Sequence, residues 1–353
     1  MKRVYLVLSL TLVIPSYLVA QDDQPFKLGT FEDDEHTYLG LVLDDRIIVD
    51  IVQANAVLEG AKPTIPAYMR ELIERYDALR PRLGEIADAA ASAAGVQASY
   101  VKDVRTIKIL PPLTPNIIYN AASNYSLHAA EMARRAGGGA EPAAVPTPDS
   151  IPGIWERMPG DTRQNPYIFL KAASTVIADG EKIRIPPGRS NLDWECELAI
   201  VIGRPASRVS SADALDYIFG YTLENDVSDR GGRGDGRMGS DWFLQKNHDT
   251  FAPLGPFIVP KEFVDDPQVL EQTLTLSGQV MQDSNTGNMT HNVYEMLSYI
   301  SNILTLKPGD VYAMGSPSGV GTARETPVYM EAGDTAVCTI ESIGTLTNPV
   351  AGP

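Results

Sequence analysis

LDWECELAIVIG, residues 192–203, reads as a β-strand that begins with two carboxylates, Glu195 and Glu197. Because alternate side chains of a strand share a face, the two glutamates point the same way and Cys196 points to the other side. The face that carries the glutamates turns apolar at Ala199, so it differs from an ordinary solvated face. Two like charges at the head of such a strand are costly unless a cation or a proton lies between them. The stretch therefore predicts a divalent metal site.

A third oxygen ligand is expected from GYTLENDVSDR, residues 220–230. Tyr221 and Leu223 alternate there with polar residues, so Asp226 would end a strand whose other face is apolar. Three carboxylates suit a hard cation such as Mg²⁺ or Mn²⁺, with Ca²⁺ as a further option, better than they suit zinc. The alternative is a turn aspartate, which is common after asparagine.

A general base is expected at His128, which Glu131 follows three residues later. If this segment begins a helix, the two side chains share a face, and Glu131 orients and charge-stabilises the imidazole. The alternative is a capped surface histidine beside a solvated glutamate. His248 is the rival base, although its loop setting suggests hydrogen bonding. The other two histidines, His36 and His291, are expected to be structural.

Two further segments suggest anion binding. Lys246 lies among aromatic, glycine and proline residues, where it could hold a substrate carboxylate or a developing enolate. The run MGSPSGVGT, residues 314–322, is rich in small residues, and its backbone N–H groups could cradle an anion. A solvated loop cation and a plain tight turn are the respective alternatives.

The first twenty residues resemble a cleavable export signal. Lys2 and Arg3 precede an apolar run over residues 4–14, and the small residue Ala20 stands before an acidic stretch. This pattern is typical of a secretory signal, and the run is too short to span a membrane. An apolar N-terminal helix of a cytosolic protein is the alternative. We therefore expect export, to the periplasm, and no membrane-spanning segment.

The composition of the chain limits the classes of molecule that the protein is expected to bind. The 353 residues are 44% hydrophobic, which is enough for one large domain or two ordinary ones. The formal net charge of −16 disfavours binding to nucleic acid and anionic lipid, so a small molecule is the expected partner, and an acidic one would need a local cationic pocket. The two cysteines, Cys196 and Cys338, make no disulfide framework. We expect Cys196 to pack in the core, although a single bridge after export stays open.

The N-terminal part reads as a small β-rich unit. Short alternating runs split by acidic turns predict an antiparallel unit over residues 26–50. Residues 66–90 read as helical, with an apolar face that includes Tyr68, Leu72, Ile73 and Tyr76.

The rest of the chain alternates short strands with Gly/Pro turns. Two segments interrupt them as helices, residues 212–219 and 293–304. This pattern predicts a β-rich α+β body rather than a doubly wound sheet, and no phosphate-loop motif is present. Residues 133–166 are rich in Gly, Ala and Pro and predict a lid or surface insertion. The expected divisions are a signal peptide (1–20), an N-terminal β-rich domain (21–112) and a catalytic domain (113–353).

Together and in this order, the motifs NYSLHAAEM, IFLKAAS, DWECELAIVIG, GYTLENDVSDR, DTFAPLGP and GSPSGVG resemble the fumarylacetoacetate hydrolase family. The resemblance runs from about residue 115 to the C-terminus without the insertion. It implies a mixed β roll or sandwich, normally a homodimer, with Glu195, Glu197 and Asp226 as metal ligands. It also implies a water-activating dyad and a lysine for the substrate's oxyanion, namely His128, Glu131 and Lys246. The residues it places beside the substrate are Tyr125, Arg230, Arg233, Gly315 and Ser316.

Some positions depart from the family pattern. Asn124 stands where true fumarylacetoacetases carry a fourth acidic ligand, and Arg233 stands where a glutamine is frequent. The insertion after Glu131 is longer than usual, and an export signal is atypical. The main expectation is metal-dependent hydrolysis of a carbon–carbon bond in a β-diketo acid such as an acylpyruvate. The alternatives are isomerisation, decarboxylation or hydration of an unsaturated 2-oxo diacid at the same site, and an exported binding protein without turnover.

Overall fold

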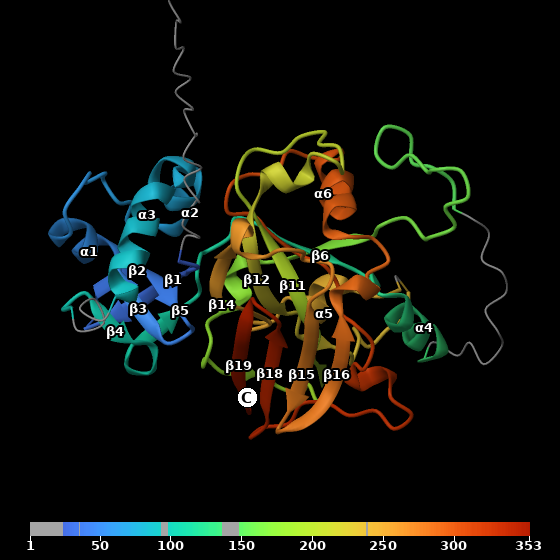
Figure 1. Cartoon of the computed structure of the whole chain (residues 1–353). Coiled ribbons are helices and arrows are strands. Elements are labelled where there is room, and N and C mark those ends of the chain that lie inside the picture. Colours follow the sequence, from blue (N-terminus) through green and yellow to red (C-terminus); the bar gives the residue numbers. More distant parts are fainter. Residues whose placement is uncertain (1–23, 35, 93–97, 136–147, 238) are drawn as a thin grey trace, which may run out of the picture.

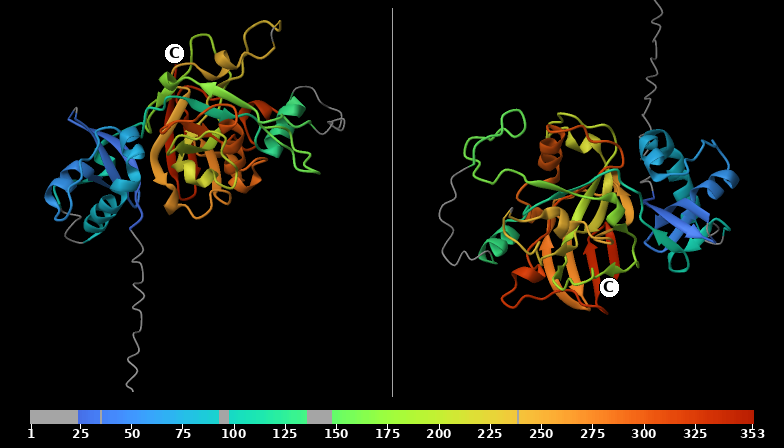
Figure 2. Two further views of the ribbon diagram at one scale, coloured as in Figure 1. Left: turned by 90° about the horizontal axis from the view of Figure 1, so that it is seen from above. Right: turned by 180° about the vertical axis from the view of Figure 1, so that it is seen from behind.

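The computed structural model describes residues 24–353 except for 35, 93–97, 136–147 and 238. The expected signal peptide and residues 136–147 of the expected insertion therefore lie outside the described residues. A small N-terminal unit lies on one side of a larger β-rich body, and α4 lies on the opposite side of that body (Figures 1 and 2). The mixed, sheet-rich architecture confirms the predicted α+β class.

The N-terminal unit is an antiparallel sheet covered by helices. Its strands are β1 (Lys27–Asp33), β2 (His36–Leu43), β3 (Ile47–Asp50), β4 (Val101–Asp103) and β5 (Lys108–Leu110). Its helices are α1 (Ile51–Val57), α2 (Met69–Glu74) and α3 (Tyr76–Ala91). The predicted apolar helical face is confirmed at Leu72, Ile73 and Tyr76, which are buried. The prediction is wrong at Tyr68, which precedes α2 and is 75% exposed.

One large sheet runs through both parts of the molecule. Its strand order is β4-β3-β2-β1-β14-β12-β11-β17-β6-β7, and β1 joins β14 through the pair Leu28 and Ile258. The body strands are β6 (Ile118–Ala121), β7 (Ile168–Lys171), β8 (Val176–Ile177), β11 (Cys196–Ile202), β12 (Ile218–Asn225), β14 (Ala252–Pro260) and β17 (Val311–Ala313). A two-stranded pair joins β10 (Leu192–Asp193) to β13 (Ser228–Asp229).

A second sheet of five strands packs against the first. Its order is β16-β15-β18-β19-β9, built from two antiparallel hairpins and one parallel edge strand. The strands are β9 (Ile183–Arg184), β15 (Glu271–Leu276), β16 (Gln279–Asn285), β18 (Thr335–Ile340) and β19 (Gly344–Ala351). Ser277 and Gly278, both with positive φ, form the two-residue turn between β15 and β16.

The two faces of β11 serve two different cores, as the alternation predicted. Trp194, Cys196, Leu198, Ile200 and Ile202 lie in the core between the sheets, and the opposite face, with Ala199 and Val201, joins the core under the N-terminal helices. A strand buried on both sides has no solvated face, and full burial of one Leu or Ile side chain contributes about 1.5–3 kcal/mol. This packing holds the head of β11, and with it the two glutamates, in one place.

Three helices belong to the body: α4 (Ser126–Arg135), α5 (Trp242–Lys246) and α6 (Val293–Ser301). The helix expected over residues 212–219 is only a 3₁₀ turn, because β12 already begins at Ile218. The described part of the insertion packs on α6, where Arg163 forms two bonds of 2.9 Å with Glu295. Among the described residues, no helix is both long and apolar enough to cross a membrane.

A disulfide between Cys196 and Cys338 links the two sheets. Cys196 packs in the core on the apolar side of its strand, as predicted, and the single bridge that the sequence left open is present. The spacing gave no sign of the bridge because 142 residues separate the two cysteines. The fold brings β11 and β18 together, and the Cα atoms of the two residues lie 5.5 Å apart.

Candidate metal centre and active site

Glu195, Glu197 and Asp226 converge as predicted. One carboxylate oxygen from each residue lies within 4.8 Å of the others, and all three residues are buried. Glu195 precedes β11 and Asp226 follows β12, and the Asp226 N–H donates to the Glu195 carbonyl at 2.8 Å, so the paired strands bring the two side chains together. An all-oxygen, buried donor set of this kind fits a hard divalent cation.

Three basic side chains surround the carboxylates. Lys246 Nζ lies 2.7 Å from Glu195 Oε2 and 2.5 Å from Asp226 Oδ2, and Lys171 Nζ lies 2.6 Å from Asp226 Oδ1. Arg230 contacts Glu195 through Nη2. Burial by itself would raise the pKa of the Glu195 carboxyl, but the charges of the neighbouring cations outweigh it and hold that pKa well below its usual range. Glu195 is therefore ionised.

At Glu197, burial and the neighbouring carboxylates shift the pKa of the carboxyl in the same direction. Burial and the neighbouring carboxylates of Asp226, Glu195 and Glu224 raise its pKa well above the ordinary value. Its Oε2 accepts one hydrogen bond, from the Gly315 N–H at 2.8 Å. A carboxyl in this position needs a proton or a cation, which is the condition the sequence predicted for the pair of glutamates.

His128 and Glu131 form the predicted pair on α4. Nδ1 of His128 lies 2.8 Å from Glu131 Oε1, and its Nε2 lies 4.0 Å from Glu195 Oε1. Glu131 also accepts from the Gly319 N–H at 3.0 Å, so its position is fixed from two sides. A carboxylate beside Nδ1 favours the tautomer that carries hydrogen there. The Nε2 lone pair is then available toward the carboxylates, and the imidazole can act as a base.

The glycine-rich run 314–322 does bind anions, and those anions are the protein's own carboxylates. Besides the bonds of Gly315 and Gly319, the N–H groups of Gly321 and Thr322 donate to Asp193 at 2.6 and 3.1 Å. Gly319 has φ +105°, and a Cβ there would lie 2.3 Å from the Met281 carbonyl oxygen, so the turn requires glycine. The run thereby places Glu197, Glu131 and Asp193 around one loop.

The residues expected beside the substrate fall into different environments. Arg230 forms ion pairs with both Glu195 and Asp193. Tyr125 is buried and donates to Gln272 at 2.9 Å; burial and then the charge of Glu197 raise its pKa far above 10. Ser316 Oγ accepts from Gln282 at 2.8 Å. Arg233 Nε lies 3.4 Å from Asp235 Oδ1 in its own loop, a contact that does not connect it to the three carboxylates.

Asn124 is occupied by backbone contacts. Its side-chain amide donates to the carbonyls of His291 and Met314, both at 2.9 Å, and its oxygen accepts from the His291 N–H at 2.9 Å. The rival base His248 lies 3.5 Å from Asp229, away from the three carboxylates. His291 is buried with Nε2 2.7 Å from the Gln164 carbonyl oxygen, consistent with a structural role.

Sequence reasoning missed Lys171, Asp193 and Glu224. Glu224 is buried on β12 directly opposite Glu197, and its Oε2 accepts from Asn120 at 2.9 Å. Burial, only partly offset by Lys171 and reinforced by Asp226, raises its pKa to about 8. The available signal was charge in an apolar setting: IFLK, LDWE and GYTLEN each place charged residues in or at the end of a strand-like run.

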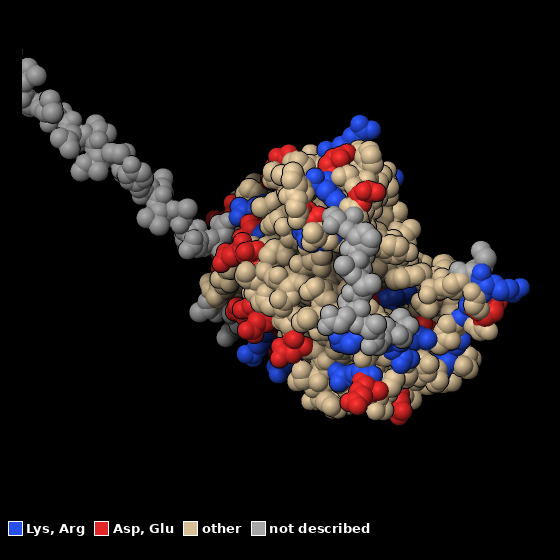
Figure 3. Space-filling view, turned by 90° about the vertical axis from the view of Figure 1, so that its right-hand side faces the viewer, with Lys and Arg blue, Asp and Glu red and all other residues tan. Residues whose placement is uncertain are grey.

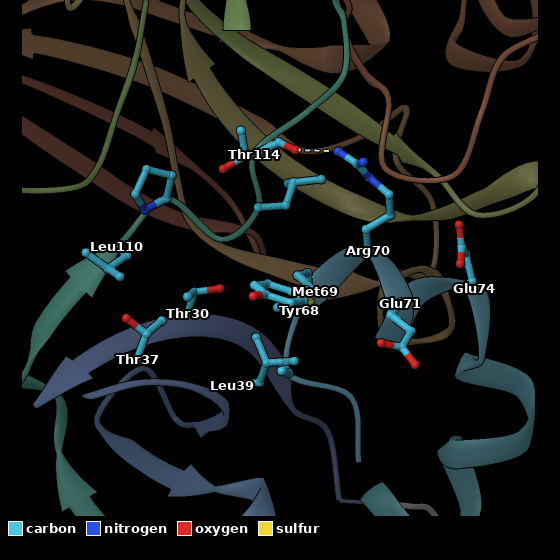
Figure 4. A pocket seen from close by; sticks show the side chains of 13 residues that line it. Thr30, Thr37, Leu39, Tyr68, Met69, Arg70, Glu71, Glu74, Leu110 and Thr114 are labelled. Atoms are coloured by element: carbon cyan, nitrogen blue, oxygen red, sulfur yellow. Dashed lines mark hydrogen bonds between the residues drawn. The ribbon is translucent and has the colours of Figure 1, made fainter. Parts of the chain in front are cut away.

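Lysine and arginine side chains border a hollow on the face that carries α4, and basic atoms lie inside it (Figure 3). At the carboxylate cluster, Lys171, Lys246 and Arg230 are each paired with carboxylates. A separate cavity of about 540 Å³ lies in the N-terminal unit, beside Leu39, Tyr68, Met69 and Leu110 (Figure 4). No residue of the carboxylate cluster lines it, so it is distinct from the candidate active site.

The sequence and the fold resemble those of known proteins. Residues 117–351 match the family model described as the C-terminal domain of fumarylacetoacetate (FAA) hydrolase. The chain belongs to the fumarylacetoacetate hydrolase family. A mitochondrial oxaloacetate tautomerase of Xenopus laevis is 34% identical over 316 residues, which cover 88% of this chain and 85% of the relative.

Solved structures of the family extend the comparison. A 5-carboxymethyl-2-hydroxymuconate delta-isomerase of Mycobacterium smegmatis is 29% identical, with a TM-score of 0.64 over 93% of this chain and 99% of that one. A maleylpyruvate hydrolase of Sphingobium sp. SYK-6, in complex with manganese(II) and pyruvate, is 27% identical, with a TM-score of 0.65 over 92% of this chain and 99% of that one. The chain is thus an enzyme of the fumarylacetoacetate hydrolase family, which includes tautomerases, isomerases and hydrolases, and its carboxylate cluster suits a divalent metal.

Proposed function

We propose that this enzyme interconverts the enol and keto forms of a small 2-oxo diacid such as oxaloacetate, with a divalent cation, Mg²⁺ or Mn²⁺, held by Glu195, Glu197 and Asp226. The observation that carries the proposal is that one base, His128, and one buried cation, Lys246, meet at the same carboxylate, Glu195. The similarity to an oxaloacetate tautomerase supports the choice of reaction. The main expectation from the sequence was hydrolysis of a carbon–carbon bond, and tautomerisation belongs instead with its alternative, isomerisation at the same site.

The proposed proton transfers need one base and a stabilised oxygen. His128 Nε2 removes a proton from the carbon next to the 2-oxo group, and the electron pair moves toward the carbonyl oxygen. That oxygen then takes up a proton from the solvent while the imidazolium releases its own, so the base is regenerated and the proton count is unchanged. Lys246 lies where it can stabilise the negative charge that grows on the oxygen. Glu131 stabilises the imidazolium in the meantime. A bound divalent cation would supply further electrostatic stabilisation of the same oxygen.

Arg230 provides a reason to prefer a diacid. It lies beside Glu195, and its Nε lies 3.0 Å from Asp193 Oδ2. A second carboxylate on the substrate would find a cation there, and a guanidinium can bind a carboxylate through two parallel bonds. Arg233, in a neighbouring loop, is proposed as an additional contact for the same group. Tyr125, Gly315 and Ser316 are proposed to line the rest of the pocket.

Hydrolysis of a carbon–carbon bond in an acylpyruvate is the second candidate. The similarity to a maleylpyruvate hydrolase favours it. The same dyad would then remove a proton from water instead of from carbon, and water would add to the distal carbonyl. The two reactions differ in product, because hydrolysis splits the substrate and tautomerisation conserves it.

One experiment separates these candidates. The purified protein is stripped with EDTA, reloaded with Mn²⁺ or Mg²⁺, and given oxaloacetate or an acylpyruvate in parallel. We expect the enol absorbance of oxaloacetate to relax faster with the reloaded protein and no faster with a His128→Ala variant. Cleavage of the acylpyruvate at a higher kcat/KM would favour hydrolysis instead. Activity that survives complete chelation would overturn the metal-dependent mechanism.

We further propose that the enzyme is exported and works as a homodimer. The apolar, basic-headed residues 1–20 support export, as does the disulfide, because such bridges persist in oxidising compartments. The N-terminal sequence of the mature protein tests the first proposal, since a start at Met1 would contradict it. Sedimentation in dilute solution tests the second, since a mass of one chain would contradict it.

A further inference from the structure

Cys196 occupies a special position, because it stands between the two glutamates of the metal site. Its side chain points away from them, into the core between the sheets, and bonds to Cys338 of β18. Along β11, the pairing with β17 begins only at Ala199. The edge of the strand at Cys196 that faces away from β12 therefore needs other partners.

Two buried glutamines of the second sheet supply those partners. Gln282 of β16 accepts a hydrogen bond from the Cys196 N–H at 3.1 Å, and Gln272 of β15 donates to the Cys196 carbonyl oxygen. Both glutamines are almost fully buried, at 1% and 0% exposure. Each side-chain amide thus replaces one partner that a neighbouring strand would have given. Cys196 is attached to the second sheet through its N–H, its carbonyl and its sulfur.

The same two glutamines also form hydrogen bonds with two other segments of the site. Gln272 Oε1 accepts from the Tyr125 hydroxyl at 2.9 Å, and Gln282 Nε2 donates to Ser316 Oγ and to the Pro317 carbonyl, both at 2.8 Å. Tyr125 immediately precedes α4, which carries the base, and Ser316 lies in the glycine-rich run. Cys196 therefore connects, through two amides, to two other segments of the site, α4 and the glycine-rich run.

We propose that the five-stranded sheet sets the spacing of Glu195 and Glu197 by holding Cys196 between them, with the disulfide as the covalent part of this support and Gln272 and Gln282 as positioning residues. This inference rests on the metal-binding part of the proposed function. A hard cation accepts its oxygen ligands only within a narrow range of distances, so a strand head that can shift binds it less well. Groups that orient ligands from behind typically change metal affinity by about 10–100-fold.

The test compares metal affinity with thermal stability. In the mature, full-length protein, a Cys196→Val/Cys338→Ala double variant removes the bridge and keeps most of the volume. Val350→Ala is the matched control: it shortens a buried side chain of β19 in the same sheet, where Val350 pairs with Ile183 rather than with Cys338 or either glutamine. The dissociation constant for Mn²⁺ is measured by electron paramagnetic resonance of the free ion, well below the melting temperature of every variant.

We expect the double variant to bind Mn²⁺ about 10–100-fold more weakly, whereas the control melts at a lower temperature with an unchanged dissociation constant. A double variant that melts early but binds Mn²⁺ within twofold of the wild type would show a purely structural bridge and overturn the proposal. Free thiols in the native wild type, detected by alkylation and mass spectrometry, would overturn the covalent part.

A second variant decides the question if the double variant does not fold. Gln272→Met keeps the length of the side chain and removes the amide that holds the Cys196 carbonyl. We expect weaker Mn²⁺ binding here too, and unchanged binding would overturn the positioning role. A wild type that does not bind Mn²⁺ at all would overturn the proposed function and this inference with it, whereas unchanged binding in the variants would overturn the inference alone.

Discussion

Lys171 supports Asp226 from behind the carboxylate cluster, with Nζ 2.6 Å from Oδ1 and a side chain that has no exposed surface. The other oxygen of Asp226 faces Lys246. The two lysines thus hold the carboxylate in one orientation, with one oxygen for each ammonium group. Removing one partner of a buried ion pair leaves the other charge uncompensated, and this is far more costly than losing a surface pair.

We expect Lys171→Met to lower the free energy of unfolding of the metal-free protein by about 3–5 kcal/mol, the usual cost of breaking a buried pair. Saturating Mn²⁺ should recover part of this loss, because a cation replaces the missing positive charge. Urea unfolding with and without Mn²⁺ measures both values. Lys182→Met, at an exposed position, is the control and should change little. Equal losses with and without metal would contradict this account of Lys171.

His128→Ala should lower kcat by about 10²–10⁴-fold, the contribution typical of a general base. Mn²⁺ affinity should stay the same, because the imidazole lies beside Glu195 and is not one of the converging carboxylates. His36→Ala, in the N-terminal unit, serves as the control. Kinetic assays of metal-saturated protein and Mn²⁺ titrations give the two quantities. A large loss of metal affinity would instead make His128 part of the metal site.

Glu131→Gln tests how the base is oriented. A glutamine could still bond to His128 Nδ1, but by donating its amide hydrogen it would favour the tautomer with hydrogen on Nε2. We therefore expect a clear loss of kcat without a comparable change in KM, although the side chain keeps its size. A variant with wild-type kcat would show that the Nδ1 contact does not set the tautomer.

The sequence alone predicted the elements of the site that depend on local periodicity. Strand alternation placed Glu195 and Glu197 on one face, and helical spacing paired His128 with Glu131; both follow from backbone geometry over a few residues. It also predicted the β-rich body, because short strands and turns leave a pattern in the sequence.

The contacts that complete the site could not be predicted in the same way. Lys171 meets Asp226 across 55 residues, and Arg230 meets Asp193 across 37. Which distant strands become neighbours depends on the order of strands in the sheet, and local periodicity carries no information about that order. Tyr68 was wrongly predicted to be in the core. The periodicity placed it on the apolar face of a helix, but the helix begins one residue later, at Met69.

Glu224 should make the metal-free protein less stable as pH rises. Its pKa is about 8 in the folded protein, above the ordinary 4.5, so between these values the folded state binds more protons than the unfolded state. Stability from a raised carboxyl pKa is present at low pH and is lost as pH rises through the folded pKa. We expect the free energy of unfolding to fall between about pH 4.5 and pH 8.

Glu224→Gln should remove that part of the fall, because a neutral amide has no proton to lose. Urea unfolding of the EDTA-treated proteins across this pH range provides the measurement. Glu325→Gln, at an exposed position, is the control and should keep the wild-type slope. An unchanged pH slope in Glu224→Gln would show that Glu224 is ionised in the folded protein throughout.

Asp193→Asn should weaken recognition of a second substrate carboxylate. The two oxygens of Asp193 accept from the N–H groups of Gly321 and Thr322 and from Arg230 Nε, so the residue connects the glycine-rich loop to the guanidinium. An asparagine has one acceptor oxygen and presents an amide group to the remaining donors. Arg230 then loses the contact that orients it, while Glu195 remains as its other partner.

We expect KM for a 2-oxo diacid to rise about tenfold, equivalent to about 1.4 kcal/mol, with a smaller effect on kcat and on a 2-oxo monoacid of similar length. Asp103→Asn is the matched control, because Asp103 accepts from the N–H and Nε of Arg105 in the N-terminal unit, away from the site. Thermal melting is measured in parallel, because Asp193 is buried and its replacement also destabilises the loop. If KM rose equally for the monoacid and the diacid, Arg230 would not be the group that selects the second carboxylate, and the preference for a diacid would need another origin.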